Sequence, residues 1–463
     1  MESSGNTIAA ISTPPGMGAI ALIRLSGPQA SEIAQSVWKG ADLRAASPRK
    51  AHLGNIVSGD GAVIDQVLLT RFAAPASFTG EDMVEIACHG STFIQQAILS
   101  RLIEAGAEPA GPGEFSMRAV INGKLDLSQA EGVADLISST SRAAADIALK
   151  QMNGGISRTL TQLTQQLTEL AALVELELDF SEEDVEFASR TRLLDTTHKI
   201  LTHLTSLIES YSTGAALRDG ISIAITGAPN AGKSSLLNAL LGDDRAIVSD
   251  IPGTTRDTIE APLILGPYKF LLTDTAGLRD TDDPIEKAGI ERTRTAASRA
   301  HILLSIIDST LTPSPALLPT ADMPSADTHH IILLNKSDRE DNRAADWQTH
   351  ISHSPAAATE LRTISTRKQE DIKSLKQRLQ TIAADMQTMA GEQIITNERH
   401  RHALHQAREA LVRVEQSLTL ELPMDMLTQD IRESIHHLST VTGTAITTPT
   451  LLRHLFAHFC IGK

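Results

Sequence analysis

The chain has 463 residues, 41% of them hydrophobic and 21% charged, with a formal net charge of -15. This length suits about three domains, and the only two cysteines, Cys88 and Cys460, exclude a disulfide framework and fit a reducing compartment. The negative charge opposes broad attraction to nucleic-acid phosphates, so a nucleic-acid partner would need a local basic patch or a second protein.

The hydropathy of the chain predicts a cytoplasmic protein without a membrane partner. No apolar run approaches the ~18–20 residues that a bilayer span requires, and the N-terminus lacks a basic segment followed by a hydrophobic one. One candidate basic patch is "NERHRHALHQAR", residues 397–408. A charge run of this kind is more often the solvated face of a helix.

The first 120 or so residues favour an α+β domain. Runs typical of strands, "AIALIRLSG", "DQVLLTRFA" and "MVEIACHG", alternate with Gly and Pro turns. No internal repeat is present.

Two leucine-rich segments predict long helices on either side of a central region. Their apolar residues recur mostly at three- and four-residue steps, which favours one helical face. The two sets are Leu160, Leu163, Leu167, Leu170, Leu173 and Leu176, and Leu404, Ala407, Leu411, Val414 and Leu418. The central region is then either inserted into one helical domain or flanked by two separate bundles.

Residues 221–384 have the alternation typical of a βαβ domain with a mainly parallel sheet. The expected strands are "ISIAIT", "KFLLT", "ILLSIID", "IILLN" and "LRTIS". The segment "TLTPSPALLPTADMPSAD", residues 310–327, is rich in proline and small residues and predicts an exposed loop.

A phosphate-binding loop follows the first of these strands. The segment "GAPNAGKS", residues 227–234, matches the P-loop pattern. Its glycines let backbone N–H groups approach phosphates at the positive end of the next helix. Lys233 is expected to reach the β- and γ-phosphates, and the Ser234 hydroxyl to coordinate Mg²⁺.

Three further segments in the same order indicate GTP. "GTTRD" offers Thr255 as a second Mg²⁺ hydroxyl, and "DTAG" places Asp274 behind the metal and the Gly277 N–H near the γ-phosphate. In "NKSD", Asp338 can accept two N–H bonds from the guanine edge, whereas adenine has no matching donor pair. The residue after "DTAG" is Leu278, which cannot orient water as the glutamine of many Ras-like GTPases does.

Further segments carry a family resemblance that covers nearly the whole chain. With "GAPNAGKSSLLNAL", "IPGTTRD", "DTAGLR", "FTGED", "GEFSMRAVINGKLDLSQAEGVADLI" and the terminal "CIGK", the chain resembles the MnmE (TrmE) family of tRNA-modification GTPases. The resemblance implies an α+β folate-binding and dimerisation domain (1–122), a discontinuous all-α helical domain (123–218 and 385–463, with the tail) and an inserted α/β Ras-like G domain (219–384).

The resemblance also implies an activity and its partners. It predicts a homodimeric GTP hydrolase, activated by K⁺ and dependent on Mg²⁺, that works with the flavoprotein MnmG in a heterotetramer or larger complex. Together they would add an aminomethyl or carboxymethylaminomethyl group to carbon 5 of the wobble uridine of certain tRNAs. The carbon would come from 5,10-methylenetetrahydrofolate or a related folate, and MnmG would help to bind the tRNA.

Two other classes of protein share parts of this pattern. A GTP-dependent, RNA-binding assembly factor can carry "GTTRD" without modification chemistry, and the N-terminal segments and the tail argue against it. A GTPase-like scaffold without activity is disfavoured by the intact Lys233, Ser234, Thr255 and Asp274.

The family motifs assign the catalytic and ion-binding residues by position. Glu286 would take over the water-orienting role, although from the residues alone it is one acid among several beside Asp280, Asp282 and Asp283. A potassium ion would replace the arginine finger of other GTPases. The implied K⁺ ligands are Asn230, Ser249, Ile251 and Thr254, and the Mg²⁺ ligands are Ser234 and Thr255.

The implied GTP-binding set is larger. It comprises Asn230, Ala231, Gly232, Lys233, Ser234, Ser235, Ser249, Asp250, Ile251, Pro252, Gly253, Thr254, Thr255, Asp274, Thr275, Ala276, Gly277, Asn335, Lys336, Asp338, Ser365, Thr366 and Arg367. Two positions depart from the family pattern: Thr366 stands where alanine is usual, and Ser91 stands where glycine is common.

The motif match places Arg24, Glu81, Lys124 and Lys463 in the folate site. A pterin offers an amidine-like edge to a carboxylate, and the glutamate tail of folate offers carboxylates to Arg and Lys. Ordinary surface ion pairs are the alternative. Cys460 is either a nucleophile near the one-carbon unit or a packed thiol, and the sequence leaves both open.

Overall fold

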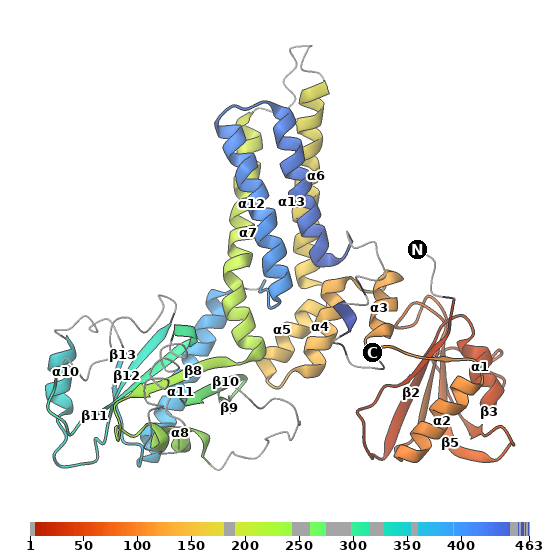
Figure 1. The fold of residues 1–463 in the computed structure, drawn as a ribbon, viewed down its shortest axis with the longest axis horizontal. Helices are drawn as coiled ribbons and strands as arrows, with labels where there is room; N and C mark the ends of the chain where they lie inside the picture. The colour runs from red at the N-terminus through yellow and green to blue at the C-terminus, as the bar shows by residue number, and fades with distance from the viewer. Residues whose placement is uncertain are drawn as a thin grey trace, which may run out of the picture. The chain divides into compact units, whose positions relative to one another are not determined.

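A computed structural model describes residues 5–179, 190–242, 260–274, 298–314, 328–352, 360–391, 393–444, 452, 455–457, 459 and 462. The chain divides into two compact units, each assembled from segments distant in sequence (Figure 1). Unit 1 comprises Met1–Ile137, Leu149–Leu201 and Ala403–Lys463. Unit 2 comprises Ser138–Ala148 and Thr202–His402.

The N-terminal part of unit 1 is built on a seven-stranded sheet in the order β3-β4-β5-β6-β2-β1-β7. Its strand pairs are antiparallel except β1 with β7. The strands are β1 (Ile8–Ile11), β2 (Ile20–Ser26), β3 (Trp38–Lys39), β4 (Ala51–Val57), β5 (Val63–Phe72), β6 (Met83–His89) and β7 (Glu108–Pro109).

Two helices, α1 (Ala30–Val37) and α2 (Thr92–Glu104), cover one face of this sheet. Ile23, Leu25 and Ile86 of the strands are fully buried in a single core with Ile98 and Leu102 of α2. The expected α+β architecture is confirmed, because alternate strand residues turn one apolar face toward these helices.

The helices that lie on either side of the sheet of unit 2 in the chain include α3 (Glu114–Ile121), α4 (Leu127–Ser138), α5 (Arg142–Met152), α6 (Gly155–Asp179), α7 (Arg190–Asp219), α12 (Glu398–Thr419) and α13 (Met424–Thr442). Helices α5, α7 and α12 each contribute residues to both units. Helices α6 and α13 pack along each other although their residues are far apart in sequence (Figure 1). One helical domain therefore receives segments from both sides of the central region, and the alternative of two separate bundles is wrong.

The leucine periodicity of α6 holds only over part of the helix. Leu160, Leu163, Leu167 and Leu170 are buried, but Leu176 is 41% exposed. From Leu170 to Leu176 the helix advances by two three-residue steps. At about 100° per residue, these steps fall about 120° short of two full turns, so Leu176 leaves the buried face. Val174 lies four residues after Leu170 and takes the buried position instead.

Unit 2 contains a six-stranded sheet in the order β13-β12-β11-β8-β10-β9. All five expected strands are present and pair in parallel. The strands are β8 (Ile221–Gly227), β9 (Glu260–Leu265), β10 (Tyr268–Asp274), β11 (Ile302–Asp308), β12 (His329–Asn335) and β13 (Glu360–Thr363).

Helices cover both faces of this parallel sheet, which explains why its central strands are apolar throughout. Helices α8 (Lys233–Leu241) and α11 (Gln369–Met389) share a core with Ile306 and Leu333. The next residue along each strand, Ile307 or Leu334, packs instead with Trp347 of α10 (Ala344–Ser352).

The sequence did not predict strand β9, which pairs antiparallel with β10 at the edge of the sheet. Pro262 lies within it and is paired with Leu271. Proline cannot donate a ladder hydrogen bond, and an edge strand tolerates it because only one side of the strand is paired.

Candidate functional site

The P-loop connects β8 to α8 with a backbone that requires glycine. Gly232, the N-cap of α8, has φ of 111°. A Cβ atom there would lie 2.3 Å from Nδ2 of Asn335. Gly227 has φ of 150°, and a Cβ atom there would lie 2.3 Å from the carbonyl oxygen of Ile306 on the neighbouring strand β11. The two glycines therefore lie in close contact with residues near the carboxyl ends of β11 and β12, where a side chain would not fit.

The P-loop lysine is folded back over this loop. Nζ of Lys233 donates to the carbonyl oxygens of Gly227 and Ala228 at 2.9 and 3.0 Å. Asn230 adopts φ of 62°, a left-handed conformation that asparagine tolerates better than most residues. Ser234 and Ser235 are exposed in the first turn of α8. The cation and the helix N-terminus together suit an anionic ligand.

One asparagine links the P-loop to the loop after β13. Nδ2 of Asn335 donates to the carbonyl oxygen of Ala231 at 2.9 Å, and its Oδ1 accepts from the backbone N–H of Thr366 at 3.1 Å. Asn335 is 1% exposed, so both bonds are protected from water. Thr366 is β-branched where the family usually has alanine, and its backbone N–H still donates to this asparagine.

Asp338 presents a carboxylate that is exposed but held in place. Its Oδ1 accepts from the Ser365 hydroxyl at 2.7 Å. Ser365 is itself fully buried, and its backbone N–H donates to Oδ2 of Asp371 at 2.7 Å. The hydrogen bond from Ser365 lowers the pKa of Asp338 below its usual value, so the carboxylate is ionised and accepts hydrogen bonds at neutral pH.

The neighbouring Lys336 is fixed by an ion pair. Its Nζ lies 2.5 Å from Oδ2 of Asp308, the last residue of β11. Burial opposes ionisation of Asp308, but hydrogen bonds from Lys336 and Thr310 outweigh it and lower the pKa of this carboxyl. Lys336 itself has φ of 65°, so backbone and side chain are both constrained.

The switch segments fall largely outside the described residues. The backbone of Asp274 ends β10, paired with Ile225 of β8. The remaining predicted ligands of this region lie outside the described residues, as do the catalytic candidates Glu286 and Cys460 and the folate candidate Lys463. These ligands are Ser249, Asp250, Ile251, Pro252, Gly253, Thr254, Thr255, Thr275, Ala276 and Gly277.

In the N-terminal domain, Arg24 and Glu81 both have partners within the protein. Arg24 lies 2.7 Å from Glu85 on the paired strand β6 and stacks over the rings of Phe78 and Phe115. Glu81 accepts from the Ser26 hydroxyl at 2.7 Å. The third candidate of the set, Lys124, is exposed.

Arg118 is a buried cation that the sequence analysis missed. It is 2% exposed and lies 3.2 Å from Glu81 and 2.9 Å from Glu114. Its position in the quoted segment "FSMRAVINGK" gave no reason to separate it from a surface arginine. Asp308 and Asp371 were missed for the same reason, because their partners lie 28 and 6 residues away.

The C-terminal tail contacts the residue that follows strand β1 of the N-terminal sheet. The carbonyl oxygen of Gly462 accepts from the Ser12 hydroxyl at 2.9 Å. Phe456 is 1% exposed and packs in a core with Met117 of α3. The described part of the tail thus contacts Ser12 and packs with α3 and α4, in the same compact unit as Arg24 and Glu81.

Part of the basic segment at residues 397–408 is paired with acidic residues of the same helix. Arg401 pairs with Glu398, and its guanidinium lies 5.2 Å from the ring centre of Tyr211. His405 lies 3.5 Å from Glu409. The interpretation as a solvated helix face fits these contacts better than a free basic patch does.

The part of the chain that the structure describes contains neither a cluster of metal-ligating side chains nor a helix that could span a membrane. No group of three His, Cys, Asp or Glu side chains there could hold a metal ion. No described helix is long and apolar enough to cross a bilayer.

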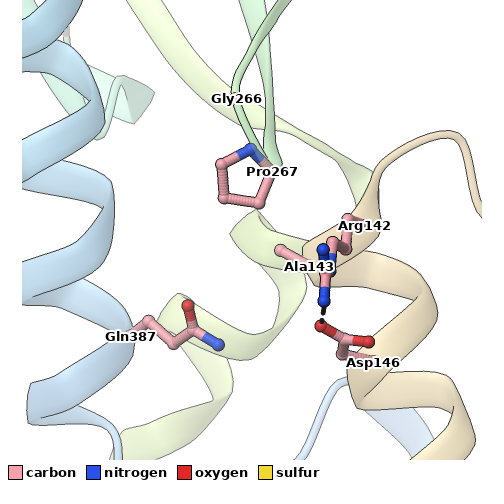
Figure 2. Close-up of a pocket in the computed structure, with 6 residues that line it drawn as sticks. All are labelled: Arg142, Ala143, Asp146, Gly266, Pro267 and Gln387. Atoms are coloured by element: carbon pink, nitrogen blue, oxygen red, sulfur yellow. Dashed lines mark ion pairs between the residues drawn. The ribbon is translucent and has the colours of Figure 1, made fainter.

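A cavity of about 540 Å³ lies in unit 2, lined by α5, the β9–β10 turn and α11 (Figure 2). Arg142 and Asp146 form an exposed ion pair at its edge, 3.8 Å apart. Gln387 accepts from the Tyr268 hydroxyl at 2.8 Å. None of its six lining residues is a predicted nucleotide ligand, so the cavity is separate from the candidate site.

This P-loop stands at the end of a parallel strand, and Asn335 joins it to the loop in which Ser365 binds the Asp338 carboxylate. The arrangement defines the G domain of a guanine-nucleotide-binding P-loop protein. The model of the MnmE helical domain matches residues 127–460, and the model of the GTP-binding protein TrmE N-terminus matches residues 7–124. The chain belongs to the MnmE family of tRNA modification GTPases.

Relatives of similar length support this assignment. The tRNA modification GTPase MnmE of Cytophaga hutchinsonii is 43% identical, over 99% of this chain and 98% of that protein. The protein of the same name from Porphyromonas gingivalis is 45% identical over equal shares. The solved structure of Aquifex aeolicus Era bound to GDP·AlF4⁻ is 24% identical over 41% of this chain and 66% of that one. Its TM-score of 0.28 does not establish a shared overall fold.

Proposed function

We propose that this chain is a GTP hydrolase that acts in the modification of the wobble uridine of tRNA. The nucleotide part of this proposal is supported by the region of the G domain where the guanine base would bind. There, Asn335 joins the P-loop to the loop of Ser365, and Ser365 holds the exposed Asp338 carboxylate. Membership of the MnmE family, whose relatives are named as tRNA modification GTPases, supports the tRNA part.

Replacement of Asp338 by asparagine tests the nucleotide assignment. The parent chain should hydrolyse GTP and not ATP, because guanine offers two N–H donors to the carboxylate. Asp338→Asn should lose GTP hydrolysis and gain xanthosine triphosphate hydrolysis, since xanthine has an oxygen where guanine has an amino group. Equal use of GTP and ATP by the parent chain would refute the proposal.

The proposed chemistry at the phosphates uses two cations. Ser234 and Thr255 would hold Mg²⁺, and the exposed position of Ser234 at the start of α8 fits this role. K⁺ would lie between Asn230, Ser249, Ile251 and Thr254 and counter the charge that develops between the β- and γ-phosphates.

The potassium assignment predicts faster hydrolysis in KCl than in NaCl at equal ionic strength. Asn230→Gly is the sharper variant, because glycine keeps the left-handed backbone of this position and removes only the side chain. It should abolish the potassium effect while nucleotide binding is retained. Equal rates of the parent chain in both salts would exclude the ion.

Glu286 is proposed to position the attacking water in place of Leu278. A carboxylate can hold a bridging water as an amide does. Glu286→Ala should then lower kcat by on the order of 10²-fold with little change in nucleotide affinity. Asp282→Ala, an acid from the same segment, is the matched control. If Glu286→Ala hydrolyses GTP with the kcat of the parent chain, Glu286 does not orient the attacking water and another group must do so.

The proposed folate site combines the tail with the N-terminal domain. Arg24 and Glu81 are engaged with protein partners, but a carboxylate has about four acceptor positions and Glu81 retains capacity for a pterin edge. Lys124, which is exposed, and Lys463 would bind the carboxylates of the folate glutamate. The contact between Gly462 and Ser12 supports a place for the tail at this domain.

Two variants separate the roles proposed for the tail. Lys463→Ala should weaken 5-formyltetrahydrofolate binding and leave GTP hydrolysis unchanged. Cys460→Ser should stop wobble-uridine modification in cells if the thiol is a nucleophile. Normal modification in Cys460→Ser would favour a packed thiol.

The remaining parts of the proposal concern assembly. We place the folate-binding domain at 1–122, the helical domain at 123–218 and 385–463, and the G domain at 219–384. A homodimer would join MnmG in a heterotetramer or larger complex in the cytoplasm, and MnmG would supply most of the tRNA contact. The net charge of -15 supports this division of labour, because the chain attracts phosphates poorly.

A further inference from the structure

Asp371 makes a hydrogen bond that helix capping does not require. It is the third residue of α11, whose N-cap is Lys368. A residue at this position ordinarily reaches back to the N-cap N–H, but the Lys368 N–H already donates to the Ser365 carbonyl oxygen at 3.0 Å. Asp371 instead accepts from the Ser365 N–H at 2.7 Å, beyond the end of the helix.

Ser365 connects this contact to the guanine-binding carboxylate. Its hydroxyl donates to Asp338 at 2.7 Å and accepts from the Arg367 N–H at 3.2 Å. Two carboxylates thus bind the same buried serine, one through the backbone N–H and one through the hydroxyl. The serine is 0% exposed with both carboxylates in place, so loss of either partner leaves a buried polar group of the serine without its acceptor.

We propose that Asp371 is a positioning residue that sets the discrimination of guanine by Asp338. This inference rests on the proposed GTP-binding function. Asp338 is exposed and depends on Ser365 for its orientation. Removal of the Asp371 carboxylate leaves a buried N–H without an acceptor, so the serine shifts and Asp338 loses its alignment with the two donors of the base.

A general electrostatic effect would produce a different pattern. Any acid in the first turn of a helix is stabilised by the helix dipole, whatever it contacts. Glu370 stands beside Asp371 in the same turn and is exposed, and its side chain makes no hydrogen bond with any residue that the structure describes. Glu370→Ala is therefore the matched control for loss of charge at this helix end.

The experiment compares GDP with inosine diphosphate on the full-length chain. The hypoxanthine base lacks the 2-amino donor and offers Asp338 one N–H instead of two. Affinities are measured by competition with a fluorescent GDP analogue for the parent chain, Asp371→Ala, Asp371→Asn and Glu370→Ala. The ratio of the two affinities reports the alignment of Asp338, because a merely less stable domain loses both ligands equally.

The parent chain should prefer GDP by about tenfold or more, as expected for one hydrogen bond to a charged group. Asp371→Ala should bring the ratio close to one and weaken GDP binding by about tenfold. Asp371→Asn should retain most of the preference, since an amide oxygen can accept the same N–H. Glu370→Ala should match the parent chain.

Two results would overturn the inference. One is a parental ratio in Asp371→Ala, and the other is an equal loss of discrimination in Glu370→Ala. If Asp371→Ala is not recovered folded, Asp371→Thr gives the same comparison, because its hydroxyl is too short to reach the Ser365 N–H. Failure of the proposed function would be visible separately, as a parent chain that binds GDP no better than ADP.

Discussion

Two carboxylates of this chain, Asp338 in the G domain and Glu81 in the N-terminal domain, are held in opposite ways. Asp338 is exposed and fixed by a neutral hydroxyl, which leaves its charge for a ligand. Glu81 is 9% exposed and lies against the buried cation Arg118, which neutralises it within the protein.

The difference separates a carboxylate whose charge is left for a ligand from one whose charge is largely neutralised by a buried cation. A carboxylate held by a hydroxyl keeps its charge and most of its acceptor positions for incoming N–H donors. For a carboxylate paired in the interior, the attraction to its cation instead offsets the cost of removing the carboxylate from water. Loss of a partner should therefore change binding at Asp338 and stability at Glu81.

The largest effect is expected at the buried pair. Arg118→Ala leaves Glu81 buried without its cation and should lower the free energy of unfolding of the N-terminal domain by about 3–5 kcal/mol. The exposed Arg44, replaced by alanine, should change it by less than about 0.5 kcal/mol. Trp38 fluorescence during urea unfolding, in a Trp347→Phe background, follows this domain. Equal midpoints for the two variants would contradict the assignment of a supporting role.

The next effect is expected at the P-loop. Gly232→Ala places a Cβ atom 2.3 Å from Asn335 Nδ2 in a left-handed backbone. The displaced loop should lower kcat/KM for GTP by on the order of 10²-fold or more. Gly242→Ala, also at a positive φ but with no described atom within 4 Å of the Cβ, is the control for backbone strain alone. Comparable losses in both would indicate strain rather than obstruction.

A smaller effect is expected at the serine beneath Asp338. Ser365→Ala should weaken GDP binding by about tenfold, as for loss of one hydrogen bond to a charged group. The pKa of Asp338 is lowered by this serine, so the parent carboxylate stays ionised until the pH falls through that lowered value. In the variant the pKa returns toward its usual value, and GDP binding should be lost at a higher pH. If the parent chain and Ser365→Ala lose GDP binding over the same acidic pH range, this hydrogen bond is not what lowers the pKa of Asp338.

The smallest effect concerns a thiol of the N-terminal sheet. Burial, and after it the charge of Asp65, raises the pKa of Cys88 to about 11. The thiolate is the reactive form, so at pH 8 Cys88 should alkylate on the order of 10²-fold more slowly than an ordinary thiol. Iodoacetamide labelling of Cys460→Ser isolates this residue. Rapid labelling at pH 8 would show that the thiol is accessible and ionised.

Much of the fold follows from local patterns in the sequence. The apolar runs of the parallel strands, the leucine periodicity of α12 and the turn signals of the first domain each depend on neighbouring residues and are confirmed, whereas the periodicity of α6 holds only as far as Leu170. The P-loop was identifiable because its glycines, lysine and serine are contiguous. Strand β9 was missed because Pro262 argues against a strand unless the strand is known to lie at an edge.

The sequence by itself determined the nucleotide-binding motifs, the class of each domain and the family, because these reside in contiguous residues and their order. Only the tertiary structure decided which charges serve a ligand and which serve the protein. Arg118, Asp308 and Asp371 resemble ordinary surface residues in the sequence. Glu81 and Lys336 reach the first two from distant segments that meet only in the fold, and the Ser365 N–H reaches Asp371 through the turn before α11. Burial then makes those contacts energetically important, since a buried charge or N–H group without a partner is costly, and no local pattern encodes burial.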